Sequence, residues 1–199
     1  MIGNDIVDLN LARQQSNWRR RGYLDKLFTH SEQELIRSAT DPDLMIWTLW
    51  SMKESAYKLI VRETSEPFFA PEKLVCQLVK IHSGTIEGSV FYQKSYPAWS
   101  IITTSYVASL AFLPDSGLRA DHEIVTFDRT DYQYQHTRIR EKIKQHYATC
   151  FSVPESSIQI QKNEKDVPML MITDFSGAII RQQAISLSHH GQYGAFAMA

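Results

Sequence analysis

Three charged side chains, Lys53, Glu54 and Lys58, lie close together in a segment whose other residues are mostly apolar or aromatic. At helical spacing they share one side of a helix with Trp50 and Tyr57, while aliphatic side chains form the other side. A helix that is apolar around most of its circumference is usually buried, and buried charges need partners or a function. A carboxylate between two lysines could hold a cation while the lysines face an anionic substrate.

The segment alone leaves two interpretations open. In the first, Glu54 and Lys58 form an i,i+4 ion pair worth about 0.2–0.5 kcal/mol, and Lys53 extends its ammonium group to water. In the second, Glu54 binds a metal ion and the lysines contact the substrate. The second interpretation requires another carboxylate elsewhere in the chain.

Asp5 is a candidate for that carboxylate because it interrupts a strand predicted over residues 2–9. An acid within an apolar strand lies either at an exposed sheet edge or in a place where it has a function. Asp8 falls on the opposite face of the strand by alternation, so we expect it to be a turn or cap residue.

Composition limits the function classes. The 199 residues are 43% hydrophobic and 22% charged, enough for one compact domain or two small lobes. A net charge of -1 and a pI near 6.7 argue against general nucleic-acid binding. The start lacks a signal-peptide pattern and no apolar run approaches the roughly 18 residues that span a bilayer, which predicts a cytoplasmic protein without a membrane segment. Cys76 and Cys150 form no C-x-x-C pair, so we expect two buried free thiols and neither a disulfide framework nor a zinc site.

The elements that position these residues follow from periodicity and from cap and turn residues. Thr29 or Ser31 before acidic residues predicts a helix to about Ala39, and Asp41-Pro42-Asp43 predicts the start of the central helix. Besides the helix that ends near residue 39, we expect helices over about 43–62 and 130–150. We expect strands over 74–81, 85–92, 99–104, 106–113, 157–161 and 169–173, a connector over 114–122, and a strand, polar turn and strand over 184–199.

Basic side chains gather in two places. One group, between residues 13 and 26, is either a solvated helix face or a docking site for an acidic partner or a ligand phosphate; it contains Arg13, Arg19, Arg20, Arg21 and Lys26. The second group lies on the helix predicted over residues 130–150 and contains Arg138, Arg140, Lys142 and Lys144.

Residues 184–199 resemble residues 99–112: each has an apolar strand, a short polar turn, a tyrosine and a strand of small apolar residues. We therefore expect an α+β fold of two similar lobes related by a pseudo-two-fold, residues 1–115 and 123–199. The second copy has Ser188-His189-His190 at the expected turn, so only it offers imidazole groups.

Four motifs in this order resemble those of the 4'-phosphopantetheinyl transferases, which move the phosphopantetheine arm of coenzyme A onto a serine of a carrier protein. The motifs are Gly3-x-Asp5-Ile6-Val7-Asp8, Phe28-Thr29 with Glu32, Trp50-x-x-Lys53-Glu54-x-x-x-Lys58, and Ser186-x-Ser188-His189. In the surfactin type the Ser-His lobe comes first, so the order here looks like a circular permutation. The holo-acyl-carrier-protein synthase type has the present order in a shorter, trimeric chain. The longer chain with its internal repeat implies a monomeric pseudodimer with one active site between the lobes.

The resemblance implies that Asp5 and Glu54 bind Mg²⁺, with Mn²⁺ as an alternative. A third acid of the surfactin type is replaced by Val7, so the resemblance implies two carboxylates and an additional water, with Asp8 outside the ligand set.

The resemblance also implies roles in the reaction. Glu54, directly or through a water, would take the proton of the carrier serine, Lys58 would neutralise or protonate the departing phosphate, and Lys53 would contact a phosphate or fix Glu54. His189 would donate a hydrogen bond to a phosphate of coenzyme A, with Ser188 shaping the turn.

Further binding regions follow from the same resemblance. The helix carrying Arg138, Lys142 and Lys144 matches the region that binds the nucleotide end of coenzyme A. A family G-K-P stretch corresponds to residues 165–168, and residues 19–21 could receive the acidic helix of an apo acyl or peptidyl carrier protein.

Two alternatives remain. The replaced acid at Val7 and the altered G-K-P stretch favour a non-catalytic relative that binds coenzyme A or a carrier protein. A magnesium phosphohydrolase for small molecules would release 3',5'-ADP without a protein acceptor.

Overall fold

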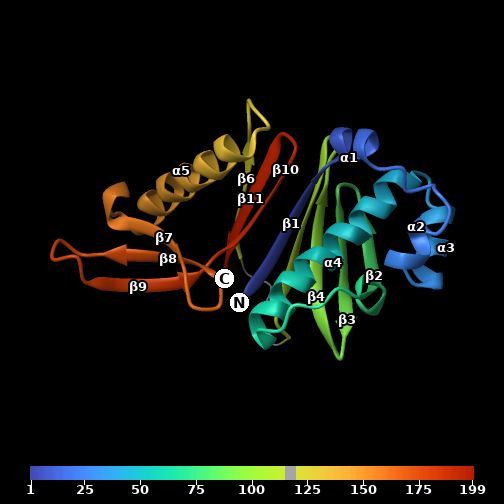
Figure 1. Ribbon diagram of the computed structural model, residues 1–199, viewed down its shortest axis with the longest axis horizontal. Helices are drawn as coiled ribbons and strands as arrows, with labels where there is room; N and C mark the ends of the chain where they lie inside the picture. The colour runs from blue at the N-terminus through green and yellow to red at the C-terminus, as the bar shows by residue number, and fades with distance from the viewer. Residues whose placement is uncertain (115–119) are drawn as a thin grey trace.

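Three antiparallel sheets and two long helices form an α+β fold (Figure 1). The computed structural model describes residues 1–114 and 120–199. Within these ranges the strand orders are β1-β5-β4-β3-β2, β10-β11-β6 and β7-β8-β9. No helix in the described part of the chain is long and apolar enough to cross a membrane.

The first half of the chain forms the five-stranded sheet and the helices beside it. Its elements are β1 (Ile2–Asp8), α1 (Leu9–Gln15), α2 (Tyr23–Leu27), α3 (His30–Ser38), α4 (Pro42–Thr64), a 3-10 turn (Pro71–Lys73), β2 (Val75–His82), β3 (Thr85–Tyr92), β4 (Lys94–Ile102) and β5 (Tyr106–Phe112).

The second half forms the two smaller sheets and α5. Its elements are β6 (Asp121–Thr126), α5 (Tyr132–Phe151), a 3-10 turn (Glu155–Ser157), β7 (Ile158–Lys162), β8 (Pro168–Thr173), β9 (Ile179–Ala184), β10 (Ser186–His190) and β11 (Tyr193–Met198).

Helix α4 is the predicted central helix and lies across one face of the five-stranded sheet (Figure 1). Asp41 caps its start by accepting a hydrogen bond from the Leu44 amide, and Pro42 occupies the first turn, where no amide donor is needed. Ser65, in the left-handed conformation, ends it. Its aliphatic side is fully buried in the largest hydrophobic core, as the sequence pattern predicts.

Gly3 allows β1 to lie directly against α4. A Cβ atom at this position would come within 1.9 Å of the Ser55 carbonyl oxygen on α4. No side chain fits there, which explains why the first residue of the G-x-D motif has to be a glycine in this fold. The close approach also sets Asp5 beside the charged face of α4.

Hydrogen bonds join β1 to β10, which lie side by side in Figure 1. The Asn4 amide donates to Ser186 Oγ at 2.9 Å, and Asn4 Nδ2 donates to Ser188 Oγ at 3.0 Å. The Asp8 amide donates to His190 Nδ1 at 2.9 Å. These bonds fix the two halves of the chain relative to one another at the strand that carries Asp5.

The predicted repeat is visible in the order of elements. In each half a strand leads into a long helix, further strands follow, and the last strand pairs antiparallel with the first: β1 with β5, and β6 with β11. We keep the two lobes, residues 1–115 and 123–199, as a proposal, with the second extended back to Asp121. His122 belongs to β6, so the connector predicted over 114–122 was too long; its residues 115–119 lie outside the described residues.

Three local predictions were wrong. The sequence pattern missed β6 and β9, because neither strand alternates regularly between apolar and polar residues. Ser188-His189-His190 belongs to β10 and not to a turn, because the chain reverses after it at Gly191, whose φ is +58°. Cys150 is exposed, whereas Cys76 is buried as expected.

Candidate active site

A cavity of about 340 Å³ lies where β1, α1, α4 and β10 meet. Asp5, Glu54 and His189 all line it, and the indole rings of Trp47 and Trp50 form part of its wall. These three titratable residues come from distant parts of the sequence, and the sequence analysis assigned all three to one site.

Lys58 binds β1 and does not pair with Glu54. Its Nζ donates to Asp5 Oδ1 at 3.1 Å and to the Asn4 carbonyl oxygen at 2.9 Å. The Asp5 side chain is 13% exposed and that of Lys58 is 27% exposed, so this ion pair is partly shielded from water. Lys58 on α4 therefore pairs with Asp5 on β1, and not with Glu54 in the i,i+4 ion pair of the first interpretation.

Glu54 has no hydrogen-bond or ion-pair partner for its carboxylate among residues 1–114 and 120–199. Burial raises the pKa of the Glu54 carboxyl, the neighbouring Asp5 carboxylate raises it further, and Lys58 lowers it. Two carboxylates that destabilise one another in a common cavity favour the binding of a cation.

His189 has an aromatic neighbour from α5, the Tyr132 ring. The Tyr132 ring lies 5.7 Å from the His189 ring and 5.8 Å from the His136 ring, measured between centroids. Burial lowers the pKa of His189, the Lys58 ammonium lowers it further, and the neighbouring His136 and His190 act in the same direction. Local positive charge of this kind favours an anion at the His189 side of the cavity.

The sequence analysis did not assign Tyr132 and His136 to the site. Their i,i+4 spacing at the start of the predicted helix was the available signal, but spacing alone does not say which face meets the site.

The side chains of Ser188 and Asp8 form hydrogen bonds that join β1 to β10 and to the turn after β10. The Ser188 side chain is buried and accepts the bond from Asn4, so its hydroxyl is directed at β1. Asp8 caps α1 by accepting from the amides of Asn10 and Leu11, and its other oxygen accepts from the Gln192 amide. The prediction that Asp8 is a cap is confirmed.

Lys53 does not face the cavity that holds Asp5 and Glu54, which corrects its expected contact with a phosphate or with Glu54. Its Nζ donates to Glu32 Oε2 at 2.8 Å and to the carbonyl oxygens of Leu27 at 2.7 Å and Pro71 at 2.9 Å. All three ammonium protons are therefore used, and the side chain is 1% exposed. Lys53 ties α4 to α3 and to the chain before β2.

Helix α5 separates its basic residues onto two flanks. Arg138 and Lys142 line a different cavity, of about 550 Å³, together with residues of β6. At helical spacing Lys144 falls on the other flank with His136 and Arg140, the flank that reaches His189. The structure therefore does not bring the three predicted nucleotide-binding residues together.

A further cavity, of about 530 Å³, lies beside Lys58. Lys58 and Tyr57 form one wall, and Lys165 to Val167 of the loop before β8, with Pro168 at the start of β8, form another. This is the stretch matched to the family's G-K-P, and the fold places it across from the charged face of α4.

The arginines near α2 are partly engaged within the chain. Arg19 forms an ion pair with Asp43 at 2.7 Å and lies over the Trp18 ring, and Arg20 lies over the Tyr23 ring. Arg20 and Arg21 remain exposed.

Comparison with known families identifies one match. The family model of the 4'-phosphopantetheinyl transferase superfamily (ACPS) matches residues 1–111, a range that contains Asp5, Glu54 and Lys58. No curated protein matches the sequence.

Proposed function

Because the chain belongs to the 4'-phosphopantetheinyl transferase superfamily, we propose that it transfers the phosphopantetheine arm of coenzyme A to a serine of an apo acyl or peptidyl carrier protein. The reaction forms a bond from the serine oxygen to phosphorus and releases 3',5'-ADP. The observation that carries the proposal is the shared cavity of Asp5, Glu54 and His189. We also propose that the protein acts as a monomer in the cytoplasm.

The donor set of the cavity fits a magnesium ion. Asp5 and Glu54 offer carboxylate oxygens, and the Glu54 carboxylate lacks a protein partner in the described part of the chain. Mg²⁺ commonly takes one or two carboxylates and completes its octahedron with water and phosphate oxygens, and Mn²⁺ accepts similar ligands. Val7 lines the same cavity without a donor atom, which fits two protein ligands. When bound, the metal would offset the charge on the pyrophosphate of coenzyme A.

The protein's own groups would handle the proton and the phosphate charge. Glu54, directly or through a bound water, would accept the serine proton. Lys58 donates only two hydrogen bonds within the described chain and retains a proton for the departing phosphate. His189 would donate to a phosphate of coenzyme A from the opposite side of the cavity. The loop at Lys165, across from Lys58, could contact the same cofactor.

Intact-mass spectrometry tests the proposal. We expect apo carrier proteins incubated with the protein, coenzyme A and Mg²⁺ to gain the mass of phosphopantetheine, and EDTA to prevent the gain. No gain on any carrier, with coenzyme A binding intact by calorimetry, would indicate a non-catalytic relative. Release of 3',5'-ADP without an acceptor would indicate a phosphohydrolase.

The raised pKa of Glu54 predicts a pH dependence of Mg²⁺ binding. The ion must displace the Glu54 proton, so affinity should fall about tenfold per pH unit below the raised pKa, starting at a higher pH than for an exposed glutamate. In the metal-free protein the folded state binds this proton more tightly than the unfolded state, so the group's contribution to stability is lost as pH rises through the raised pKa. Calorimetric titration with Mg²⁺ over a pH series measures the first effect. In Glu54→Gln the fall in Mg²⁺ affinity caused by the Glu54 proton should be absent. A pH dependence of Mg²⁺ affinity equal to that of the wild type would contradict the assignment of Glu54 as a ligand.

A further inference from the structure

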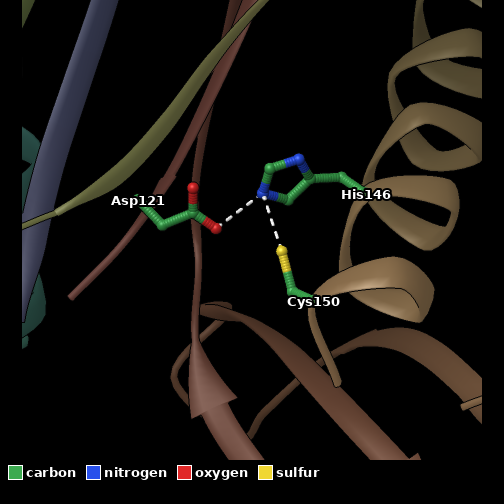
Figure 2. Close-up of side chains that lie close together, drawn as sticks. All are labelled: Asp121, His146 and Cys150. Carbon is green, nitrogen blue, oxygen red and sulfur yellow. Dashed lines mark hydrogen bonds and ion pairs between the residues drawn. The ribbon is translucent and has the colours of Figure 1, made fainter. Parts of the chain in front are cut away.

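Asp121, His146 and Cys150 form a cluster of potential metal ligands outside the candidate active site (Figure 2). His146 Nε2 lies 2.7 Å from Asp121 Oδ2 and 3.5 Å from Cys150 Sγ. The three donor atoms all lie within 4.8 Å of one another. The Figure 2 view shows the carboxylate and the thiol on the same side of the imidazole, both directed at Nε2.

The fold holds these side chains in place. Asp121 is the first residue of β6, while His146 and Cys150 are one helical turn apart near the end of α5. The His146 ring packs edge-on against Tyr147 and Phe196, with centroid distances of 4.8 and 5.5 Å. Aromatic packing on two sides restricts the rotation of the imidazole, so a ligand nitrogen is oriented before any ion arrives.

A second carboxylate lies at the other ring nitrogen. Glu123 Oε1 is 3.8 Å from His146 Nδ1, and a carboxylate on this side stabilises the proton on Nδ1 when Nε2 binds a metal. The charge balance points the same way. Asp121 and Glu123 both lie beside the His146 ring, so the site offers two carboxylates that attract a cation.

We propose that Asp121, His146 and Cys150 bind a Zn²⁺ ion. A thiolate with an imidazole selects a borderline-soft ion such as zinc over Mg²⁺ or Ca²⁺. Tetrahedral zinc with Zn–N near 2.1 Å and Zn–S near 2.3 Å places N and S about 3.6 Å apart, close to the observed spacing. The Asp121 carboxylate oxygen, now hydrogen-bonded to Nε2, has to move about 0.7 Å further from Nε2 to reach the separation of two ligand atoms on tetrahedral zinc. Binding releases the Cys150 proton, and the proton that Nε2 shares with Asp121 in the metal-free site moves to Nδ1, on the side of Glu123.

The site would clamp the end of α5 to the start of β6. His146 lies on the flank of α5 that carries Arg138 and Lys142, and it lines their cavity together with Glu123, which leaves solvent access for the ion and for a water as fourth ligand. His189 and the carboxylates Asp5 and Glu54 do not line this cavity, so the proposed zinc ligands are separate from the carboxylates proposed to bind Mg²⁺.

Titration of the tag-free, reduced protein with Co²⁺, followed by displacement with Zn²⁺, tests the inference. We expect one equivalent of Co²⁺ to give thiolate-to-cobalt charge-transfer absorption that Zn²⁺ abolishes. Cys150→Ser should remove the absorption, and Asp121→Asn should weaken Zn²⁺ binding by more than tenfold. Glu123→Gln, which removes only the partner of Nδ1, should weaken binding by about 10-fold.

Matched controls separate this site from other metal ligands. His82→Ala, at an exposed histidine of β2, and the double variant Asp5→Ala/Glu54→Ala should leave the absorption unchanged. Absence of charge-transfer absorption in the wild-type protein would overturn the inference. Absorption that survives in Cys150→Ser would overturn it as well. Circular dichroism of each variant confirms that the fold is retained, which is expected for Cys150→Ser because this residue is exposed.

Discussion

Asp5→Ala and Glu54→Ala are each expected to lower phosphopantetheine transfer by at least ~10³-fold, because each removes one of two carboxylates proposed to hold the metal. Glu54→Ala also removes the proposed acceptor of the serine proton. Asp5→Ala also deprives Lys58 of its 3.1 Å partner and changes the charge that the departing phosphate meets. Initial rates of carrier modification at saturating coenzyme A and Mg²⁺ measure the effect.

Stability separates loss of a ligand from loss of the fold. The Glu54 carboxylate has no protein partner in the described chain and its pKa is raised by burial, so its removal should not lower the free energy of unfolding of the metal-free protein. Glu66→Ala, at an exposed residue just after α4, is the matched control and should transfer at the wild-type rate. Wild-type activity in Asp5→Ala or Glu54→Ala would remove the proposed metal ligands.

The sequence predicted best where a pattern is local. The N-cap at Thr29, the start of α4 at Asp41-Pro42 and the cap at Asp8 each follow from residues within one turn of the feature, and the structure confirms them. Strands β6 and β9 lack a comparable signal, because neither alternates apolar and polar residues, and β11, the partner of β6, lies far along the chain.

Site residues show the same limit. Periodicity places Lys53, Glu54 and Lys58 on one side of a helix, but it does not say which neighbouring element each side chain meets. The structure directs Lys53 to α3, Lys58 to β1 and Glu54 to the cavity with His189. The proposed zinc ligands escaped sequence analysis for a similar reason: His146 and Cys150 share a helix face, but their third partner lies 25 residues before His146.

The buried pair of Lys53 and Glu32 should carry a large share of the stability of the first half of the chain. Glu32 is fully buried, and its two oxygens accept from Lys53, from the Thr29 amide and from the Cys76 amide. This carboxylate thus joins α3, α4 and β2, and loss of the lysine leaves it as an uncompensated buried charge.

Lys53→Met, which keeps most of the side-chain volume, is therefore expected to lower the free energy of unfolding by about 3–5 kcal/mol, measured by urea denaturation. Glu32→Gln/Lys53→Met removes both charges and should recover part of the loss. Lys94→Met breaks the exposed pair with Glu63 and should cost at most about 1 kcal/mol. Folded Lys53→Met should still transfer phosphopantetheine, because the Lys53 ammonium donates all its protons within the fold. If Lys53→Met is as stable as the wild type but inactive, Lys53 takes part in the reaction, because the chemistry would then depend on an ammonium group that the fold does not need.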